Sequence, residues 1–249
     1  MGRVSSTYRE LPPPSHLAAS VACLWVREAV ADGTQLVVPD GCIDLVASSR
    51  GVMVAGPDTG PMPTALRRGD TILGLRFCPG AAPPVLGWPA NELRDRRVAL
   101  EDLPGVKSFL AALEEGVAKK DLTPLVGVVG RRLREVPAPD PLVRAAVGAL
   151  ARDRPVRDLP PHLHLSERQL RRRFHAAVGY GPKVLARVLR LQRMLALAPG
   201  ACGNLARLAA EAGYADHAHM AAETARLTGL TPGALLDDRF AQAPAHLAA

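Results

Sequence analysis

The sequence predicts an α+β protein, with a β-rich N-terminal half and an all-α C-terminal half. Three observations predict this class. Short apolar segments separated by turn residues fill residues 19–99. Apolar residues at helical spacing fill most of residues 142–236. A Pro-rich stretch at 136–141 separates the two parts. We therefore expect one domain over residues 1–135 and a second over residues 136–249, each of ordinary domain size.

Composition excludes several classes of protein. The chain has 249 residues, of which 48% are apolar, which is too many for a disordered chain. No run reaches the ~18 apolar residues of a membrane helix. Charged residues precede any apolar run at the N-terminus, unlike a signal peptide. We expect a cytoplasmic protein without membrane contact. The four cysteines, Cys23, Cys42, Cys78 and Cys202, form no Cys-x-x-Cys pair and predict no disulfide framework.

The N-terminal half contains five predicted strands, at residues 20–27, 34–39, 43–48, 52–55 and 71–78. Strands this short and closely spaced favour a small barrel or sandwich. The mouth of such a barrel can hold a small ligand. Two amphipathic helices follow, at residues 108–117 and 122–136. Their apolar faces either pack within the domain or form a dimer interface.

Positive charge is concentrated in the second half. Residues 1–135 hold 16 Lys+Arg against 15 Asp+Glu, whereas residues 136–249 hold 15 against 9. Within the second half, residues 166–193 carry eight basic side chains and one acid. A basic block on a helical pattern is either a solvated helix face or the binding surface for a polyanion.

Two helix-turn-helix units are predicted in this basic half. Asp140 and Pro141 begin a first helix, and a short helix follows with Pro160 and Pro161 in its first turn. Ser166 and Gln169 have the spacing of a capping box for the next helix, which ends at Gly179. Its apolar residues share one face: Leu170, Phe174 and Val178. A basic second helix of this kind fits the DNA major groove, which is ~12 Å wide.

The pattern then recurs 50 residues later, with Asn204 and Asp216 as the two caps and Gly213 in the turn. The predicted connecting helix, at residues 182–197, would span ~24 Å at ~1.5 Å per residue. With the width of the flanking units added, two recognition helices can enter major grooves one DNA turn, ~34 Å, apart. The pairs His162, His164 and His217, His219 lie on different helix faces, so they predict no metal site.

These segments resemble the DNA-binding domain of the AraC/XylS family of bacterial transcription regulators. The resemblance lies in the residues 165–174 (LSERQLRRRF), 179–182 (GYGP), 213–219 (GYADHAH) and 227–232 (LTGLTP). Residues 39–45 and 74–80 are also similar to the poorly characterised sensory domain of some such regulators. The resemblance implies a non-enzymatic regulator that binds double-stranded DNA. It also favours the dimer interpretation of the helices at 108–136, with RNA polymerase as a further partner.

The resemblance implies Arg168, Arg171 and Arg172 as base readers, because Arg commonly reads guanine in bidentate fashion. The remaining DNA-binding residues that it implies are Ser166, Gln169, Arg173, Lys183, His217, His219 and Arg226. The second unit departs from the family pattern at Ala222, Thr224 and Ala225. Residues 194–236 carry a net charge of −1, so we expect the first unit to supply most of the affinity.

The N-terminal half holds few chemically notable groups. We predict that a small-molecule effector contacts residues among Trp25, Asp40, Cys42, Asp44, Arg76, Phe77 and Trp88. The alternative interpretation is that these are buried cysteines and aromatics with a structural Asp–Arg pair.

Three functions stay open on the sequence alone. The first is a transcription regulator that responds to a ligand or a stress, without metal or cofactor. The second is a Cys42-based thiol sensor or alkyl-transfer enzyme fused to a DNA-binding domain. The third is a DNA-binding protein without an effector.

Overall fold

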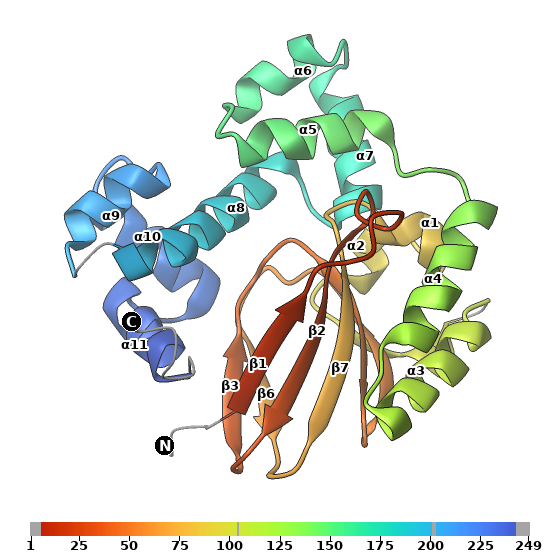
Figure 1. Ribbon diagram of the computed structural model, residues 1–249. Coiled ribbons are helices and arrows are strands. Elements are labelled where there is room, and N and C mark those ends of the chain that lie inside the picture. Colours follow the sequence, from red (N-terminus) through yellow and green to blue (C-terminus); the bar gives the residue numbers. More distant parts are fainter. Residues whose placement is uncertain (1–5, 104, 201–202, 243–249) are drawn as a thin grey trace.

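Six antiparallel strands form the main sheet of the N-terminal half (Figure 1). In order across the sheet they are β1 (Ser6–Leu11), β2 (Val21–Ala29), β7 (Thr71–Phe77), β4 (Ile43–Ser48), β5 (Gly51–Ala55) and β8 (Arg97–Ala99). The computed structural model describes residues 6–103, 105–200 and 203–242, with side chains up to residue 238. Cys202 lies outside the described residues. The predicted α+β class is confirmed.

A second sheet lies against one face of the first. It consists of β3 (Gly33–Val37) and β6 (Met62–Leu66), which pair antiparallel. Leu66 packs against Trp25 and Ile72 of the main sheet, so the two sheets face each other. Strand alternation separates the two faces of the main sheet: in β4, Leu45 points into the helical layer and Asp44 points between the sheets.

The five predicted strands are present, each within two residues of its predicted ends. Three further strands were not predicted, for local reasons. β1 reads STYREL, which is mostly polar, and β8 has three residues. β6 contains Pro63, which argues against a strand unless it is an edge strand, and β6 is one.

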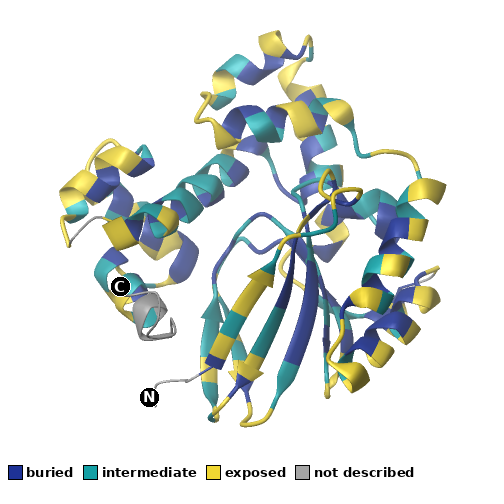
Figure 2. Cartoon of the chain, in the orientation of Figure 1, coloured by how far each residue is buried: buried dark blue, intermediate teal, exposed yellow. Residues whose placement is uncertain are grey.

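Helices cover the other face of the main sheet. They are α1 (Ala82–Leu86), α2 (Ala90–Leu93), the 3₁₀ turn Leu100–Asp102, α3 (Lys107–Lys119) and α4 (Thr123–Glu135). Phe109 and Leu113 of α3, and Val129 of α4, are buried in a core shared with the sheet. Figure 2 shows the buried inner and exposed outer sides of these helices. Internal packing therefore occupies most of their apolar faces, as one of the two interpretations predicted, and the dimer interface stays a prediction.

Local sequence signals set the ends of the C-terminal helices. The first group comprises α5 (Pro141–Ala151), the 3₁₀ turn Val156–Asp158, α6 (Leu159–His162), α7 (Glu167–Val178) and α8 (Pro182–Leu197). Asp140 caps α5, with its Oδ1 accepting from the Leu142 N–H at 2.9 Å. The two prolines of α6 occupy its first turn, as predicted. α8 spans the predicted residues 182–197.

The second unit comprises the 3₁₀ turn Ala198–Gly200, α9 (Leu205–Ala212), α10 (His217–Thr228) and α11 (Pro232–Gln242). Asn204 and Asp216 are the N-caps of α9 and α10, as predicted. α11 was not predicted from the sequence. No helix among the described residues is both long and apolar enough to cross a bilayer.

The two halves are in contact along α7 and α8. Val38, from the loop after β3, is buried in the core of the second unit. Gly41, in the same loop, lies so close to α8 that a Cβ there would stand 2.9 Å from Leu185 Cδ1. At the end of α7, a Cβ on Gly179 would stand 2.6 Å from Pro57 Cγ. These contacts leave no room for side chains at the two glycines.

Candidate nucleic-acid interface and ligand cavity

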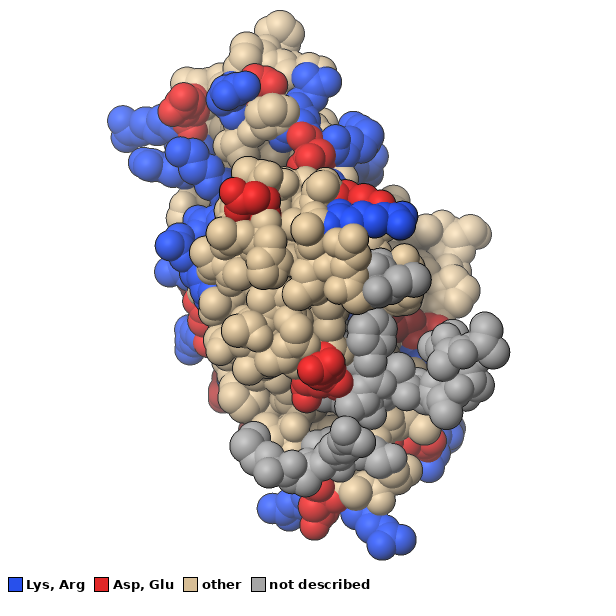
Figure 3. All heavy atoms as spheres, turned by 90° about the vertical axis from the view of Figure 1, so that its left-hand side faces the viewer, with Lys and Arg blue, Asp and Glu red and all other residues tan. Residues whose placement is uncertain are grey.

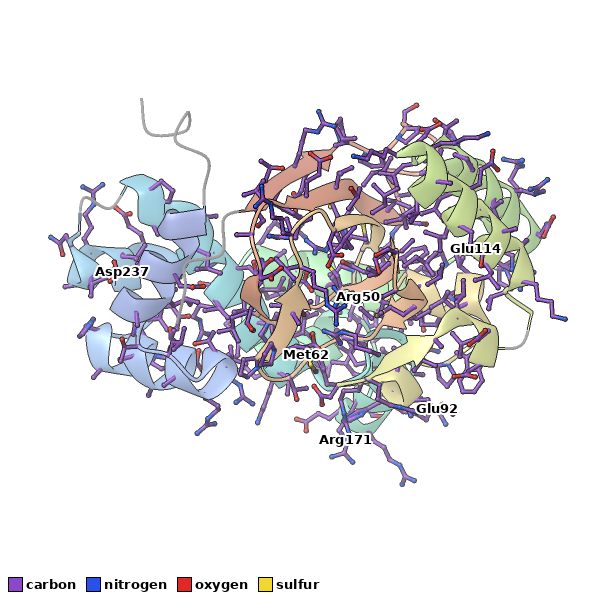
Figure 4. The ribbon with its side chains drawn as sticks, turned by 90° about the horizontal axis from the view of Figure 1, so that it is seen from below. Arg50, Met62, Glu92, Glu114, Arg171 and Asp237 are labelled. Atoms are coloured by element: carbon purple, nitrogen blue, oxygen red, sulfur yellow. The ribbon has the colours of Figure 1, made fainter. Side chains whose placement is uncertain are left out.

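Helix α7 presents a basic face to solvent. Its first turn is fixed by a capping box: Ser166 Oγ accepts from the Gln169 N–H at 3.2 Å, and Gln169 Oε1 accepts from the Ser166 N–H at 2.9 Å. Leu170 and Phe174 are buried beneath the helix. Arg168, Arg171 and Arg172 are exposed, and Figure 4 shows Arg171 projecting away from the molecule.

The other predicted residues of the first unit have different surroundings. Arg173 Nη1 lies 2.6 Å from Asp140 Oδ2, so Arg173 ties α7 to the N-terminus of α5. Ser166 and Gln169 are exposed but are bonded to each other in the cap. Lys183 is exposed at the start of α8. The three exposed arginines and Lys183 therefore remain open to an anionic partner, whereas Arg173 is paired with Asp140.

Helix α10, the predicted second recognition helix, has little charge. His217 is exposed in its first turn, and Arg226 is exposed in its last turn. His219 is engaged within the unit, since its Nδ1 accepts from the Ala215 N–H at 3.2 Å. Its Nε2 also lies 3.4 Å from Glu223 Oε1. In Figure 3, which faces the side of α9–α11, Lys and Arg gather at the top and along one edge, and the middle of the face is mostly uncharged.

A cavity of about 540 Å³ lies between the two sheets. Its volume is in the range of small-molecule sites. Apolar side chains form much of its wall: Leu36, Val46, Met53, Met62 and Ile72. Arg50 and Met62, both labelled in Figure 4, line it from the two opposing sheets. Gln192, from α8, also lines the cavity, and its Nε2 donates to the Pro39 carbonyl at 2.6 Å.

Arg76 sits in the wall of this cavity among three carboxylates. Its guanidinium binds Asp44 in bidentate fashion, with Nε and Nη2 each 3.1 Å from a carboxylate oxygen. Asp40 Oδ2 lies 3.1 Å from Nε, and Glu10 Oε1 lies 3.3 Å from Nη1. Trp25 Nε1 donates to Asp44 Oδ2 at 3.1 Å. Burial raises the pKa of Asp44 to about 6, although Arg76 lowers it.

The structure brings four of the predicted ligand residues together: Trp25, Asp40, Asp44 and Arg76 all line the cavity. It separates the other three. Phe77 follows Arg76 in β7, so it points to the opposite face and is buried under the helices. Trp88 packs on that same core. Cys42 does not line the cavity, and its Sγ lies 3.8 Å from the Asp40 carbonyl oxygen.

Several residues of the cavity wall were not predicted from the sequence. Tyr8 and Glu10 lie on β1, which was not predicted, and Gln192 comes from the other half of the chain. The sequence contained one signal for two of the cavity residues. Side chains in a strand point alternately to the two faces of the sheet, and Asp44 in β4 and Arg76 in β7 are charged residues between apolar neighbours that point to the opposite face. A charged residue at such a position either faces solvent or faces a site.

Burial disfavours the thiolate form of the cysteines in the N-terminal half. Burial raises the pKa of Cys23 to about 12 and raises that of Cys42 well above its usual value, with Asp40 adding to the effect. Burial also raises the pKa of the Cys78 thiol. A protonated thiol neither attacks an alkyl group nor ligates a metal readily. Among the described residues, no group of His, Cys, Asp and Glu could hold a metal ion.

Comparisons with known families match two segments of the chain. Residues 161–238 match the family described as helix-turn-helix domain. Residues 9–99 match a domain of unknown function, DUF6597. No curated protein matches the chain.

Among solved structures, the chain is similar to ToxT from Vibrio cholerae O395, with 8% identity, 95% of this chain and 98% of that chain covered, and a TM-score of 0.42. It is also similar to ToxT from Vibrio cholerae strain SCE256 with bound unsaturated fatty acid, with 10% identity, 94% of each chain covered and a TM-score of 0.40. Likenesses this distant carry no conclusion about ligand or partner.

The family match covers both helix-turn-helix units, and it coincides with the capped, basic helix α7 and its tandem partner α10. A match of this kind indicates a DNA-binding regulator and not an enzyme. The chain carries an AraC-type helix-turn-helix domain at residues 161–238, preceded by a domain of unknown function, and it is a DNA-binding transcription regulator.

Proposed function

We propose that this regulator reads a specific DNA sequence mainly through α7, and that a small molecule bound between the two sheets alters that reading. The observation that carries the proposal is the position of Gln192. It belongs to α8, the helix that joins the two helix-turn-helix units, and it lines the cavity of the N-terminal half. A ligand in the cavity can therefore touch the DNA-binding part directly.

The DNA-reading part of the proposal rests on exposure and charge. Arg168, Arg171 and Arg172 are exposed on the capped helix, and Arg fits the O6 and N7 atoms of guanine. Lys183 stands at the start of the neighbouring helix, where it suits a phosphate contact. α10 offers His217 and alanines, so we expect it to add less affinity than α7.

The coupling part rests on one loop. Val38 and Gly41 pack against the core and the side of α8, and Pro39 accepts a hydrogen bond from Gln192. Asp40, in the middle of this loop, is paired with Arg76 in the cavity wall. A ligand that draws Arg76 or Asp40 to itself changes the position of the loop and hence its hold on α8.

We also propose that the boundary between the two domains lies near residue 135. The apolar core of the N-terminal half includes Val129, and the core of the first helix-turn-helix unit begins with Val143. A homodimer, contact with RNA polymerase and a cytoplasmic location stay predictions.

The test of DNA reading is a titration of the DNA upstream of the protein's own coding sequence against random DNA at physiological salt. Arg171→Ala and Arg172→Ala should each weaken specific binding by about 1–3 kcal/mol and relax the sequence preference. The matched control is Arg68→Ala, which removes the same charge from the exposed turn between β6 and β7. Equal binding of both DNAs by the unsubstituted protein contradicts the proposal.

The test of sensing is a thermal-shift screen of a metabolite library on the full chain, followed by DNA titration with each stabilising compound. We expect at least one compound to raise the melting temperature and to change DNA affinity. Gln192→Ala should reduce the second effect more than the first. If no compound stabilises the protein, regulation by abundance alone is the better interpretation.

A further inference from the structure

The cavity between the sheets has an unbalanced charge at one end. There, Arg76 is the centre of a cluster with Glu10, Asp40 and Asp44. One guanidinium against three carboxylates leaves an excess of negative charge. The side chain of Asp44 is only 13% exposed. Buried charges are normally paired, so such an excess suits a further cation.

The other arginines that line the cavity are engaged elsewhere. Arg97 is held by Asp58, with Nη1 and Nη2 at 2.8 and 2.6 Å from its carboxylate oxygens. Arg50 Nη2 lies 3.0 Å from Asp70 Oδ2 and donates to the Ala65 carbonyl. The Arg27 guanidinium lies over the Tyr8 ring, 4.6 Å from its centroid. The charge of Arg97 also interacts with Asp44 and Asp40, so Arg97 offsets part of the excess beside Arg76.

Aromatic side chains border the acidic cluster. The indole of Trp25 donates to Asp44 and also lines the cavity. Its ring lies directly over Gly74, where a Cβ would stand 2.1 Å from Trp25 Cε2. Tyr8 stands beside Trp25, with ring centroids 6.1 Å apart, and donates to Glu10 at 2.6 Å. Carboxylates beside aromatic faces form the usual surroundings of a bound organic cation.

We propose that the ligand of this cavity is a small organic cation, such as an amine with an apolar body. The ammonium group binds among Asp44, Asp40 and Glu10 near Trp25, and the apolar body lies along Met53 and Met62. Asp40 directly follows Pro39, whose carbonyl accepts from Gln192 of α8, so the cation is bound close to the contact between the cavity wall and α8. This inference rests on the proposed function, because it names the ligand class of the same site.

The test compares three probes of similar size and different charge on the full chain: benzylamine, benzyl alcohol and benzoate at pH 7.5. Thermal shift and calorimetric titration give the affinity of each. We expect benzylamine to bind more tightly than the other two. Asp44→Asn and Asp40→Asn should each weaken benzylamine binding about tenfold or more. The control is Glu114→Gln, which removes an acid from α3, on the far side of the main sheet (Figure 4).

Several results overturn the inference. They are tighter or equal binding of benzoate, no binding of benzylamine at millimolar concentration, and unchanged benzylamine binding in both Asp variants. Near-UV circular dichroism establishes that each variant is folded, and the Asp40 variant serves if Asp44→Asn does not fold. DNA titration in the same buffers distinguishes a failure of the cation inference from a failure of the proposed function. Preserved specific DNA binding with a preference for benzoate rejects the cation only, whereas loss of specific DNA binding by the unsubstituted protein rejects the proposed function.

Discussion

At the scale of single residues, the cavity wall is built on two features that a sheet face rarely combines. One is a charge cluster around Arg76, and the other is an indole lying flat on a glycine. Trp25, Asp44 and Arg76 stand on β2, β4 and β7, three inner strands of the main sheet, whereas Glu10 comes from the edge strand β1 and Asp40 from the loop before β4. Because the inner strands are held on both sides by neighbours, the centre of the cluster has a fixed geometry, as a binding site requires.

Asp44 gives a pH prediction. Its pKa is raised from 3.8 to about 6 in the folded protein, chiefly by burial, with Asp40 raising it and Arg76 and Trp25 lowering it. The protonated form therefore stabilises the fold, and this contribution is complete below about pH 4 and is lost as the pH rises through 6. The free energy of unfolding of the wild type, relative to Asp44→Asn, should increase as the pH falls from 7 to 4.

Urea unfolding at a series of pH values measures this difference. Asp121 is a control of opposite sign, because bonds from Thr123 lower its pKa. Relative to Asp121→Asn, the wild type should lose stability as the pH falls. A difference between wild type and Asp44→Asn that does not change over this range contradicts the assignment.

Gly74 gives a packing prediction. Gly74→Ala places a methyl group within 2.1 Å of the Trp25 ring, so the indole must move or the strand must bend. We expect a loss of about 1–3 kcal/mol in the free energy of unfolding. The comparison is Gly60→Ala, where a Cβ meets nothing within 4 Å. If both variants unfold at the same urea concentration, the indole is not seated on Gly74.

At the scale of elements, α7 depends on its cap. The helix has a basic face, and four of its twelve residues are arginines, so like charges repel along it. The capping box gives hydrogen-bond acceptors to two N–H groups at the start of the helix. On the opposite face, Leu170 and Phe174 are buried in the core. The cap therefore keeps Arg168 in helical register at the point where the helix would meet DNA.

Ser166→Ala should lower the free energy of unfolding by about 1 kcal/mol, because the Gln169 N–H loses its acceptor. DNA affinity should fall with it, since the first turn frays. Thermal unfolding and DNA titration measure the two effects. Ser166→Asp keeps an acceptor at the cap and should retain stability, and Ser49→Ala, in an exposed turn, is the neutral comparison.

At the scale of the whole molecule, the N-terminal half braces both helix-turn-helix units. The loop with Val38 and Gly41 lies along α8, and Pro57 lies against Gly179 at the end of α7. Gly229, at the end of α10, faces Pro61, which also belongs to the N-terminal half. The relative position of the two units is thus determined by more than the helix that joins them (Figure 1).

Gln192→Ala removes the hydrogen bond from α8 to the Pro39 carbonyl and should cost about 1 kcal/mol. Because this bond joins the two halves, their separation should become easier, and protease should cut the stretch at 136–140 several times faster. Limited proteolysis followed by mass spectrometry measures the rate. Arg187→Ala is the matched control, because the Arg187 side chain bonds within α8, to the Lys183 carbonyl. Equal cleavage of the two variants contradicts the bracing role of Gln192.

The sequence by itself determined the helical units and their basic face. Caps such as Ser166 and Asp216, and stops such as Gly179, act on neighbouring residues, so local spacing locates them to within a residue. The central strands were also predictable from their apolar runs. The edge strand β1 was not, because a polar strand forms only when its partner offers free N–H and C=O groups.

Only the tertiary structure decided the cavity. Arg76 meets Asp44 through the pairing of β4 with β7, and Glu10 joins them from β1, far away in the sequence. Gln192 reaches Pro39 across 153 positions of the chain. No local pattern encodes which face of a sheet a second sheet will cover, or which helix will line the cavity between the sheets, because both depend on the packing of the whole chain.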